Sequence, residues 1–178
     1  MSKGKPIFSR AMQVGLFQFT SNPSQRLYVL NNHFISVPDR SIDRRKLQAG
    51  MNAKVVSVIR GKDPNALILM GGDLNTYPRP DEPDPSHPKD TLGDLYRSGL
   101  FNLNDEILRN NPSQAYTYVY HGESGTLDHL FVNQTMEKLC VNVLIPHVNA
   151  DWPEHFNSTD GLGCSDHDPL VAVFKFPF

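Results

Sequence analysis

The sequence predicts a mixed α/β (α+β) fold, and three observations support this class. Runs rich in β-branched and aromatic residues occur in pairs, one long segment carries apolar residues at helical spacing, and a short continuous apolar run follows that segment. At 178 residues the chain has about the length of one domain. The middle of the chain is therefore expected to form a strand, a helix and a strand, in that order.

The first predicted element is a β-hairpin near the N-terminus. After a short polar lead at residues 1–6, the runs at residues 13–20 and 26–31 are apolar, aromatic and β-branched, and the sequence SNPSQ separates them. Asn, Pro and Ser favour turns, so the two runs are expected to pair as antiparallel strands.

A long helix is predicted next, over residues 41–60. Its apolar residues recur at helical spacing: Leu47, Met51, Val55, Val58 and Ile59. Gly61 is placed to end this helix, with Pro64 just beyond it. The apolar run at residues 66–70 lies between Pro64 and Gly71, which predicts a strand buried on both faces.

The second half of the chain predicts shorter elements. Five prolines make residues 77–89 a surface loop, because proline is excluded from helix and strand interiors. Residues 115–120 and 126–133 flank the turn sequence HGESG and are expected to pair as a hairpin. The other expected elements are short helices at residues 91–98 and 105–109 and strands at residues 139–148 and 169–176.

Composition and charge exclude several classes of protein. The chain has 17 Lys and Arg against 19 Asp and Glu, so a generally basic protein that coats nucleic acid is excluded, while a locally basic cleft is not. No apolar run is long enough to span a bilayer, and the N-terminus has no apolar secretory segment. Cys140 and Cys164 could form one bridge but no disulfide framework. We expect a soluble chain that carries no targeting signal.

Polar residues that could carry chemistry lie at the ends of the predicted strands. They are Asn32, His33, Asp73, Asn75, Asp128, His129, Asp166, His167 and Asp168. Strand ends on one edge of a sheet converge, so these side chains are expected to form one site. Asp128 is the most informative, because a carboxylate in an apolar strand needs a cation, a hydrogen bond or a metal ion. A buried structural salt bridge is the alternative for Asp128.

Two further groups of residues have competing interpretations. Basic residues at the start of the long helix oppose its dipole, which favours a contact with a phosphate backbone, although a solvated helix face explains them as well. They are Arg40, Arg44, Arg45 and Lys46. Tyr77, Tyr118 and Tyr120 could stack on bases, but alternating aromatic residues in a strand are more often core or cross-strand pairs.

Four motifs together resemble those of the endonuclease/exonuclease/phosphatase superfamily, the pancreatic-deoxyribonuclease-like proteins. In chain order they are NNHF at residues 31–34, GGDLN at 71–75, LDHLFV at 127–132 and SDHDPL at 165–170. The segments YTYVYHGESGTLDHLFV and PHVNADWPE look closest to the bacterial extracellular deoxyribonuclease branch. The resemblance covers roughly residues 8–178.

The resemblance implies a fold and an organisation. The fold would be a two-layer β-sandwich flanked by helices, with residues 7–178 as its C-terminal part and the N-terminal half missing. The family pattern also includes a Glu that is the principal metal ligand, and each Glu of this chain lies in a different context. We therefore expect a fragment, a truncated product or one half of a split enzyme. His33 is also expected to lack the carboxylate partner that it has in the family pattern.

The resemblance also implies a catalytic role for five residues. His167 would act at the phosphate as acid or base, and Asp128 would fix its tautomer and orientation. Asp73 would orient or deprotonate the attacking water, Asn75 would donate to a phosphate oxygen, and His33 would donate to another or protonate the leaving group.

The same resemblance implies the metal and the substrate contacts. Asp166 would bind Mg²⁺, or Mn²⁺ or Ca²⁺ in its place, because hard cations prefer oxygen ligands. Asn32 and Arg45 are assigned to substrate binding. The chain lacks a zinc-type spacing of histidines, such as H-E-x-x-H, which argues against a zinc enzyme.

The predicted function is that of a metal-dependent phosphodiester hydrolase, an endo- or exodeoxyribonuclease with DNA as substrate and no membrane partner. One alternative is a phosphomonoesterase or a sphingomyelinase-like phospholipase of the same superfamily. Another is a non-catalytic interaction module that associates with itself or with the missing half through exposed apolar surface. Secretion is suggested only by the branch that the chain resembles.

Overall fold

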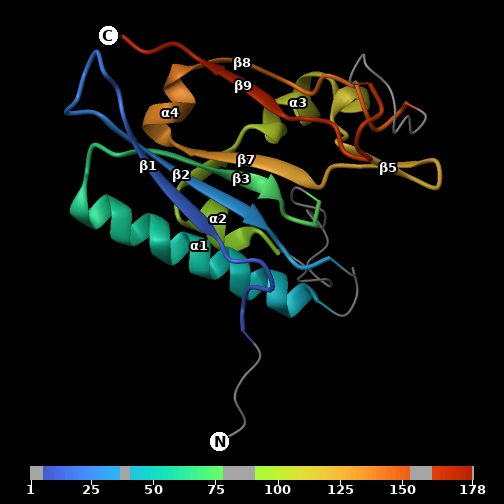
Figure 1. The fold of residues 1–178 in the computed structure, drawn as a ribbon, viewed down its shortest axis with the longest axis horizontal. Coiled ribbons are helices and arrows are strands. Elements are labelled where there is room, and N and C mark those ends of the chain that lie inside the picture. Colours follow the sequence, from blue (N-terminus) through green and yellow to red (C-terminus); the bar gives the residue numbers. More distant parts are fainter. Residues whose placement is uncertain (1–5, 37–40, 78–90, 153–161, 178) are drawn as a thin grey trace, which may run out of the picture.

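The computed structural model describes residues 6–36, 41–77, 91–152 and 162–177 (Figure 1). Its elements are, in chain order, β1 (Gln13–Gln18), β2 (Arg26–His33), α1 (Ile42–Lys62), β3 (Leu67–Asp73), α2 (Gly93–Arg97), β4 (Leu100–Asn102), α3 (Asn104–Asn110), the 3-10 helix η1 (Pro112–Gln114), β5 (Tyr118–Tyr120), β6 (Glu123–Gly125), β7 (Asp128–Asn133), α4 (Gln134–Leu139), β8 (Cys140–Leu144) and β9 (Val171–Phe174).

A mixed sheet in the strand order β1-β2-β3-β7-β4 forms the centre of the fold. β1 and β2 pair antiparallel, which confirms the predicted N-terminal hairpin. β2 and β3 pair in parallel and α1 connects them, which confirms the predicted succession of strand, helix and strand. β7 runs antiparallel to both of its neighbours, β3 and β4.

Each face of this sheet packs on a different layer (Figure 1). On one face α1 and α2 bury the larger core, in which Leu30, Met70 and Phe131 of the sheet are fully buried. On the other face α4 and the two-stranded sheet β8–β9 cover Leu67 and Val132. The mixed α/β class is thus confirmed, and in the described residues the second layer of the predicted sandwich is a two-stranded sheet.

The end of α1 differs from the sequence prediction. Gly61 lies inside the helix, which continues to Lys62 and has Asp63 as its C-cap. A glycine can remain in a helix at modest cost, whereas the residue before a proline is driven out of the helical region. Pro64 therefore ends the helix, two residues later than expected.

The buried face of α1 also differs from the predicted apolar stripe. Leu47 and Val58 are 58% and 56% exposed, whereas Gln48 and Asn52 are fully buried. The side chain of Gln48 accepts a hydrogen bond from the backbone N–H of Ile35 at 3.2 Å. Buried polar groups need hydrogen-bond partners. Polar side chains of α1 therefore face inward where an adjacent segment has a buried backbone group to be satisfied.

The predicted hairpin around HGESG is wrong in its pairing. β5 pairs with β6, which includes residues of the expected turn, with Tyr118 opposite Gly125. β7 instead enters the central sheet beside β3, with Leu69 opposite Val132. Both faces of β7 bury apolar side chains, so it gains more from a central position than from a surface hairpin.

Further along the chain, the strand predicted at residues 139–148 is confirmed over Cys140–Leu144, and Leu139 is the last residue of the unpredicted helix α4. α4 begins with Asn133 as its N-cap, whose side chain accepts from the N–H of Met136 at 3.3 Å. Asn is among the residues that best satisfy the first N–H groups of a helix. β8 and β9 pair antiparallel across the long segment between them, and β4 is a short strand that the sequence did not predict.

Two consecutive glycines of β3 pass unusually close to neighbouring backbone. A Cβ added at Gly71 would lie 2.4 Å from the carbonyl oxygen of His129, and one added at Gly72 would lie 2.0 Å from that of Asn32. Gly72 also has a φ of 121°, which L side chains rarely adopt. The glycine pair before Asp73 therefore serves a close approach of three strands.

His129 is fully buried in the core and is held as a neutral ring. Its Nε2–H donates to the carbonyl of Thr76 at 2.7 Å, while its Nδ1 accepts from the side-chain amide of Asn102 at 3.1 Å. Burial lowers the pKa of His129 to about 4. Burial disfavours the protonated ring, because its charge would have no water around it.

Acid is expected to destabilise the protein through His129. The unfolded chain takes up this proton near the ordinary pKa of about 6.5 and the folded chain only near pH 4, so stability falls as the pH falls between these values. At about 1.4 kcal/mol for each tenfold difference in proton affinity, the loss amounts to about 3 kcal/mol. Urea unfolding of wild type and His129→Gln between pH 7 and pH 4 measures it. An equal dependence on pH in both proteins would contradict this assignment.

Four other expectations concern residues outside the site. Cys140 and Cys164 are both free thiols, so the possible bridge is absent. Most of the predicted proline-rich loop, residues 78–89, lies outside the described residues, as do most of the residues of the polar lead. Among the helices that the structure describes, none is both long and apolar enough to cross a bilayer.

Candidate active site

Three predicted site residues lie side by side across the central sheet. His33 is opposite Asp73 in the parallel pair β2 and β3, and Asp73 is opposite Asp128 in the antiparallel pair β3 and β7. Directly opposed residues on neighbouring strands have Cβ atoms about 4.5–5.5 Å apart. The sheet thus brings an imidazole and two carboxylates together at the edge where β2 and β3 end.

His167 joins this row through Asp128. Its Nδ1 lies 2.7 Å from Oδ2 of Asp128, and the side chains of His167 and Asp128 are 25% and 20% exposed. The hydrogen bond to Asp128 raises the pKa of His167 above its ordinary value, against the opposite effect of burial. Because Nδ1–H donates to the carboxylate, proton exchange with a substrate falls to Nε2.

The backbone of Asp128 is held from both sides. Its N–H donates to Oγ1 of Thr117 at 3.1 Å, and its carbonyl accepts from the side-chain amide of Asn104 at 2.7 Å. Asn104 is fully buried and was missed by the sequence analysis. It follows the unpredicted strand β4, so no motif in the sequence pointed to it.

Asp73 has both oxygens engaged. Oδ2 lies 3.3 Å from Nε2 of His33, which corrects the expectation that His33 has no carboxylate partner. Oδ1 accepts from the backbone N–H of Asn75 at 2.8 Å. Burial raises the pKa of Asp73, and the nearby charge of Asp128 adds to this effect. A carboxylate with a raised pKa is a stronger base than an exposed one.

Asn75 holds Asp73 in place. Its φ is 49°, a conformation that Asn tolerates better than most residues. Its amide nitrogen donates to Oδ2 of Asp73 at 3.0 Å and to the carbonyl of Phe34 at 3.1 Å. An amide has only two protons to donate, so the predicted donation from Asn75 to a phosphate oxygen does not fit this geometry.

The two residues predicted to contact substrate lie in the interior. Asn32 and Arg45 are each 4% exposed. The amide of Asn32 donates to Oδ1 of Asn52 at 3.0 Å and receives a bond in return at 2.9 Å, while Arg45 donates to the carbonyl of Ile35 at 3.3 Å. These side chains serve the packing of α1 against the end of β2, so the predicted substrate contacts of Asn32 and Arg45 do not fit the structure.

Asp166, the predicted metal ligand, is exposed beside His167. Its carboxylate is a hard oxygen ligand of the type that Mg²⁺ prefers. Within the part of the chain that the structure describes, no group of three or more His, Cys, Asp or Glu side chains could hold a metal ion. One exposed carboxylate does not complete a coordination shell, so these residues do not fit a preformed metal centre.

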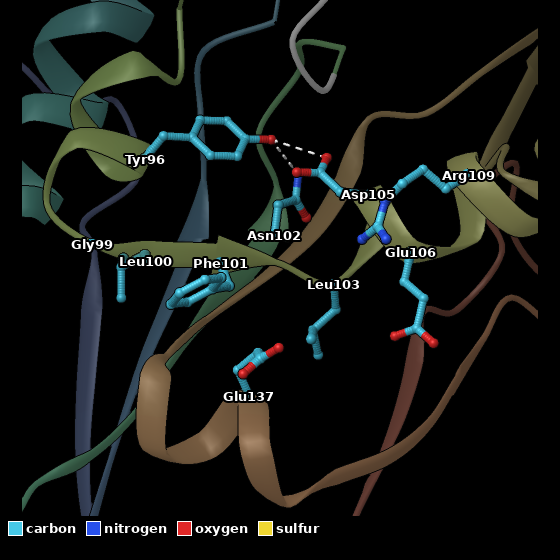
Figure 2. Close-up of a pocket in the computed structure, with 10 residues that line it drawn as sticks. All are labelled: Tyr96, Gly99, Leu100, Phe101, Asn102, Leu103, Asp105, Glu106, Arg109 and Glu137. Carbon is cyan, nitrogen blue, oxygen red and sulfur yellow. Dashed lines mark hydrogen bonds between the residues drawn. The ribbon is translucent and has the colours of Figure 1, made fainter.

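No Glu of the described chain completes that centre. Glu123 is exposed on the β5–β6 hairpin. Glu106 and Glu137 line a separate cavity of about 250 Å³ beside β4. Figure 2 shows this cavity, in which the hydroxyl of Tyr96 donates to Asp105 at 3.2 Å. None of the eight predicted site residues lines it.

Tyrosines lie close to the row of site residues. The rings of Tyr118 and His167 are 4.7 Å apart, and those of Tyr118 and Tyr120 are 6.1 Å apart and nearly parallel. Tyr120 is 60% exposed and Tyr77 is 52% exposed. The core interpretation of these two tyrosines is therefore wrong. The exposed ring of Tyr120 also lies 4.1 Å from the ring of His121.

The comparisons with known proteins agree with the motifs. A family model described as "Endonuclease/Exonuclease/phosphatase family" matches residues 10–167. The humanized TDP2 of D. rerio has a similar structure, with a TM-score of 0.60 at 15% identity, as does an AP endonuclease from Archaeoglobus fulgidus, with 0.56 at 16%. D. rerio TDP2 complexed with single strand DNA product gives 0.55 at 16%. A sequence search of curated proteins finds no match.

These similarities cover most of this chain but only part of the others. The matches include 93% of this chain, with 60% of the humanized TDP2, 61% of the DNA-bound TDP2 and 70% of the AP endonuclease. At such low identity they show the fold alone. The finer resemblance to bacterial extracellular deoxyribonucleases gains no support from these structures and stays a prediction.

Proposed function

The chain belongs to the endonuclease/exonuclease/phosphatase family, and we propose that it hydrolyses phosphodiester bonds in DNA. One observation carries this proposal: His33, Asp73, Asp128 and His167 form a continuous row of imidazole and carboxylate groups at one edge of the sheet. Support for DNA comes from the exposed ring of Tyr120, which stacks on Tyr118 beside His167, and from the DNA product in the D. rerio TDP2 structure. A place in the extracellular deoxyribonuclease branch rests on the sequence motifs only.

His167 carries the charge at the phosphate in this proposal. The bond to Asp128 raises its pKa, so more of the ring is protonated near neutral pH than for an ordinary histidine. A protonated ring stabilises negative charge that develops on phosphate oxygens and can deliver a proton from Nε2. Asp128 fixes the tautomer and the orientation of the ring.

Asp73 and His33 act on the opposite side of the row. The raised pKa of Asp73 suits it to accept a proton from the attacking water. His33 has a side chain that is 42% exposed, so it can reach a phosphate oxygen or the leaving oxygen while it contacts Asp73. Asn75 keeps Asp73 in this position through two hydrogen bonds.

Divalent metal ions are typical of this family. The described residues offer Asp166 as one oxygen ligand and do not complete a site. The proposed steps therefore use only side chains of this chain, and EDTA in the cleavage assay measures the dependence on Mg²⁺, Mn²⁺ or Ca²⁺.

Two other functions compete with the proposal. A phosphomonoesterase or a sphingomyelinase-like phospholipase would use the same row of residues on another substrate. Exposed apolar side chains on β1 and on the outer face of β8–β9 favour an interaction module, because exposed apolar surface is typical of association sites. These side chains are Val14, Leu16, Phe17, Val141, Leu144, Val171 and Val173.

Nicking of supercoiled plasmid by the purified chain tests the proposal. We expect nicked product with Mg²⁺ or Mn²⁺ present and far slower nicking by the His167→Ala variant at equal concentration. EDTA in a parallel reaction measures the dependence on metal. An abasic-site oligonucleotide, a 3′-phosphorylated oligonucleotide, an inositol phosphate and sphingomyelin are tested beside the plasmid.

Each outcome separates the candidates. Hydrolysis of the inositol phosphate or of sphingomyelin without cleavage of DNA would replace the proposal by the first alternative. A folded chain that cleaves none of these substrates and forms oligomers in light scattering would favour the interaction module. Nicking that persists in His167→Ala would remove His167 from the site.

A further inference from the structure

Asp168 is a buried carboxylate to which the proposed mechanism assigns no role. Its side chain is fully buried, yet four donors surround it. Oδ1 accepts from three consecutive backbone N–H groups, those of Val148 at 3.0 Å, Asn149 at 2.8 Å and Ala150 at 3.1 Å. Oδ2 accepts from Nδ1 of His147 at 2.9 Å. Residues 147–150 thus form a turn wrapped around one carboxylate.

Both oxygens of this carboxylate are engaged by the turn. Separating a buried acceptor from its donors is costly, because no water replaces them. The turn is therefore firmly attached to the residue that follows His167 in the chain.

The turn also holds the segment that contains Asp166 and His167. Asn149 is 9% exposed and uses both ends of its amide. Its nitrogen donates to the carbonyl of His167 at 3.0 Å, and its oxygen accepts from the N–H of Cys164 at 3.3 Å. One side chain thereby bridges the two ends of residues 164–167.

A second set of bonds connects the same segment to Asp128. The N–H of Asp168 donates to the carbonyl of Thr117 at 2.7 Å. The hydroxyl of Thr117 accepts from the N–H of Asp128 at 3.1 Å. Both residues of the His167–Asp128 pair are therefore attached to Thr117, one directly and the other through Asp168.

We propose that Asp168 and Asn149 are positioning residues, which together hold His167 at hydrogen-bonding distance from Asp128. Asp168 fixes the turn, and Asn149 in that turn fixes the backbone of His167. The inference rests on the proposed function, because it concerns the same His167. A small displacement of a catalytic group lowers the rate steeply, which gives the positioning a measurable effect.

The Asn149→Ala variant tests the proposal, with Asn142→Ala as the matched control. Asn142 is exposed on β8 and is not among the residues that surround Asp168. We expect Asn149→Ala to lower kcat for DNA cleavage by about 10–100-fold with KM unchanged. Asn142→Ala should stay within about twofold of wild type. An unchanged kcat in Asn149→Ala would overturn the proposal.

A double mutant separates positioning from general stability. In the His167→Ala background, Asn149→Ala should lower the residual activity no further, because groups that act as one unit do not contribute independently. A purely structural role would reduce both backgrounds by the same factor and would overturn the proposal. Asp168→Asn, which weakens the acceptor of the turn, should behave like Asn149→Ala.

Hydrogen–deuterium exchange gives a measurement that does not depend on activity. In Asn149→Ala, amide exchange should rise at residues 162–168 and stay unchanged in α1. If neither wild type nor any variant cleaves DNA but this local rise occurs, the proposed function fails while the positioning contacts are supported. If exchange at residues 162–168 is unchanged while wild type cleaves DNA, the positioning proposal fails and the proposed function stands.

Discussion

Replacing His167 by alanine is expected to lower the rate of DNA cleavage by about 10²–10⁴-fold, the usual loss of a general acid or base. The variant loses the ring whose Nδ1 lies 2.7 Å from Asp128 and whose charge this bond favours. Initial rates of plasmid nicking measure the effect, with circular dichroism to show that the variant folds. His121→Ala is the matched control, because His121 is exposed on the turn between β5 and β6. A rate near that of wild type in His167→Ala would contradict the assignment.

Asp128→Asn is expected to resemble His167→Ala, and the double variant should be no slower than the worse of the two. Asp128 has no separate contact with the phosphate in the proposed mechanism, because it acts by orienting His167. Residues that act as a unit give losses that are grossly non-additive. Losses that multiply in the double variant would show that the two residues act independently.

Gly72→Ala is expected to destabilise the fold by about 4 kcal/mol or more, at the extreme of single substitutions. A Cβ at this position would lie 2.0 Å from the carbonyl oxygen of Asn32, and the φ of 121° is unfavourable for alanine. β2 and β3 cannot move away from each other without losing the pairing that places His33 beside Asp73. Urea unfolding monitored by circular dichroism measures the loss, and a variant that does not fold agrees with it.

Gly61→Ala is the control for this substitution. Gly61 lies inside α1, and a Cβ there would meet no atom within 4 Å. Alanine is favoured over glycine in a helix by about 0.5–1 kcal/mol, so this variant should be slightly more stable than wild type. Equal stability of Gly72→Ala and Gly61→Ala would show that the close approach in β3 is not a constraint.

The candidate site was predictable in part, because its residues follow or begin strands that the sequence indicates. His33 and Asp73 follow two predicted strands and end β2 and β3 in the structure, and Asp128 lies within a third predicted strand. Periodicity cannot show which strands become neighbours, so the pairing of β3 with β7 could not be predicted, and neither could the contact between His33 and Asp73. The buried positions of Asn32 and Arg45 were also beyond prediction, since both residue types usually lie at the surface.

By itself the sequence determined the local features of this protein: an N-terminal hairpin, a long helix, a buried strand and four motifs in the order of the endonuclease/exonuclease/phosphatase family. These depend on contacts within a few residues, where turn residues and apolar spacing decide the structure. The tertiary structure alone decided which distant polar groups meet: Asn75 with the carbonyl of Phe34, Asn104 with that of Asp128, and Asn149 with that of His167. Each of these amides satisfies a polar group whose partner is set by packing, which a linear pattern does not record.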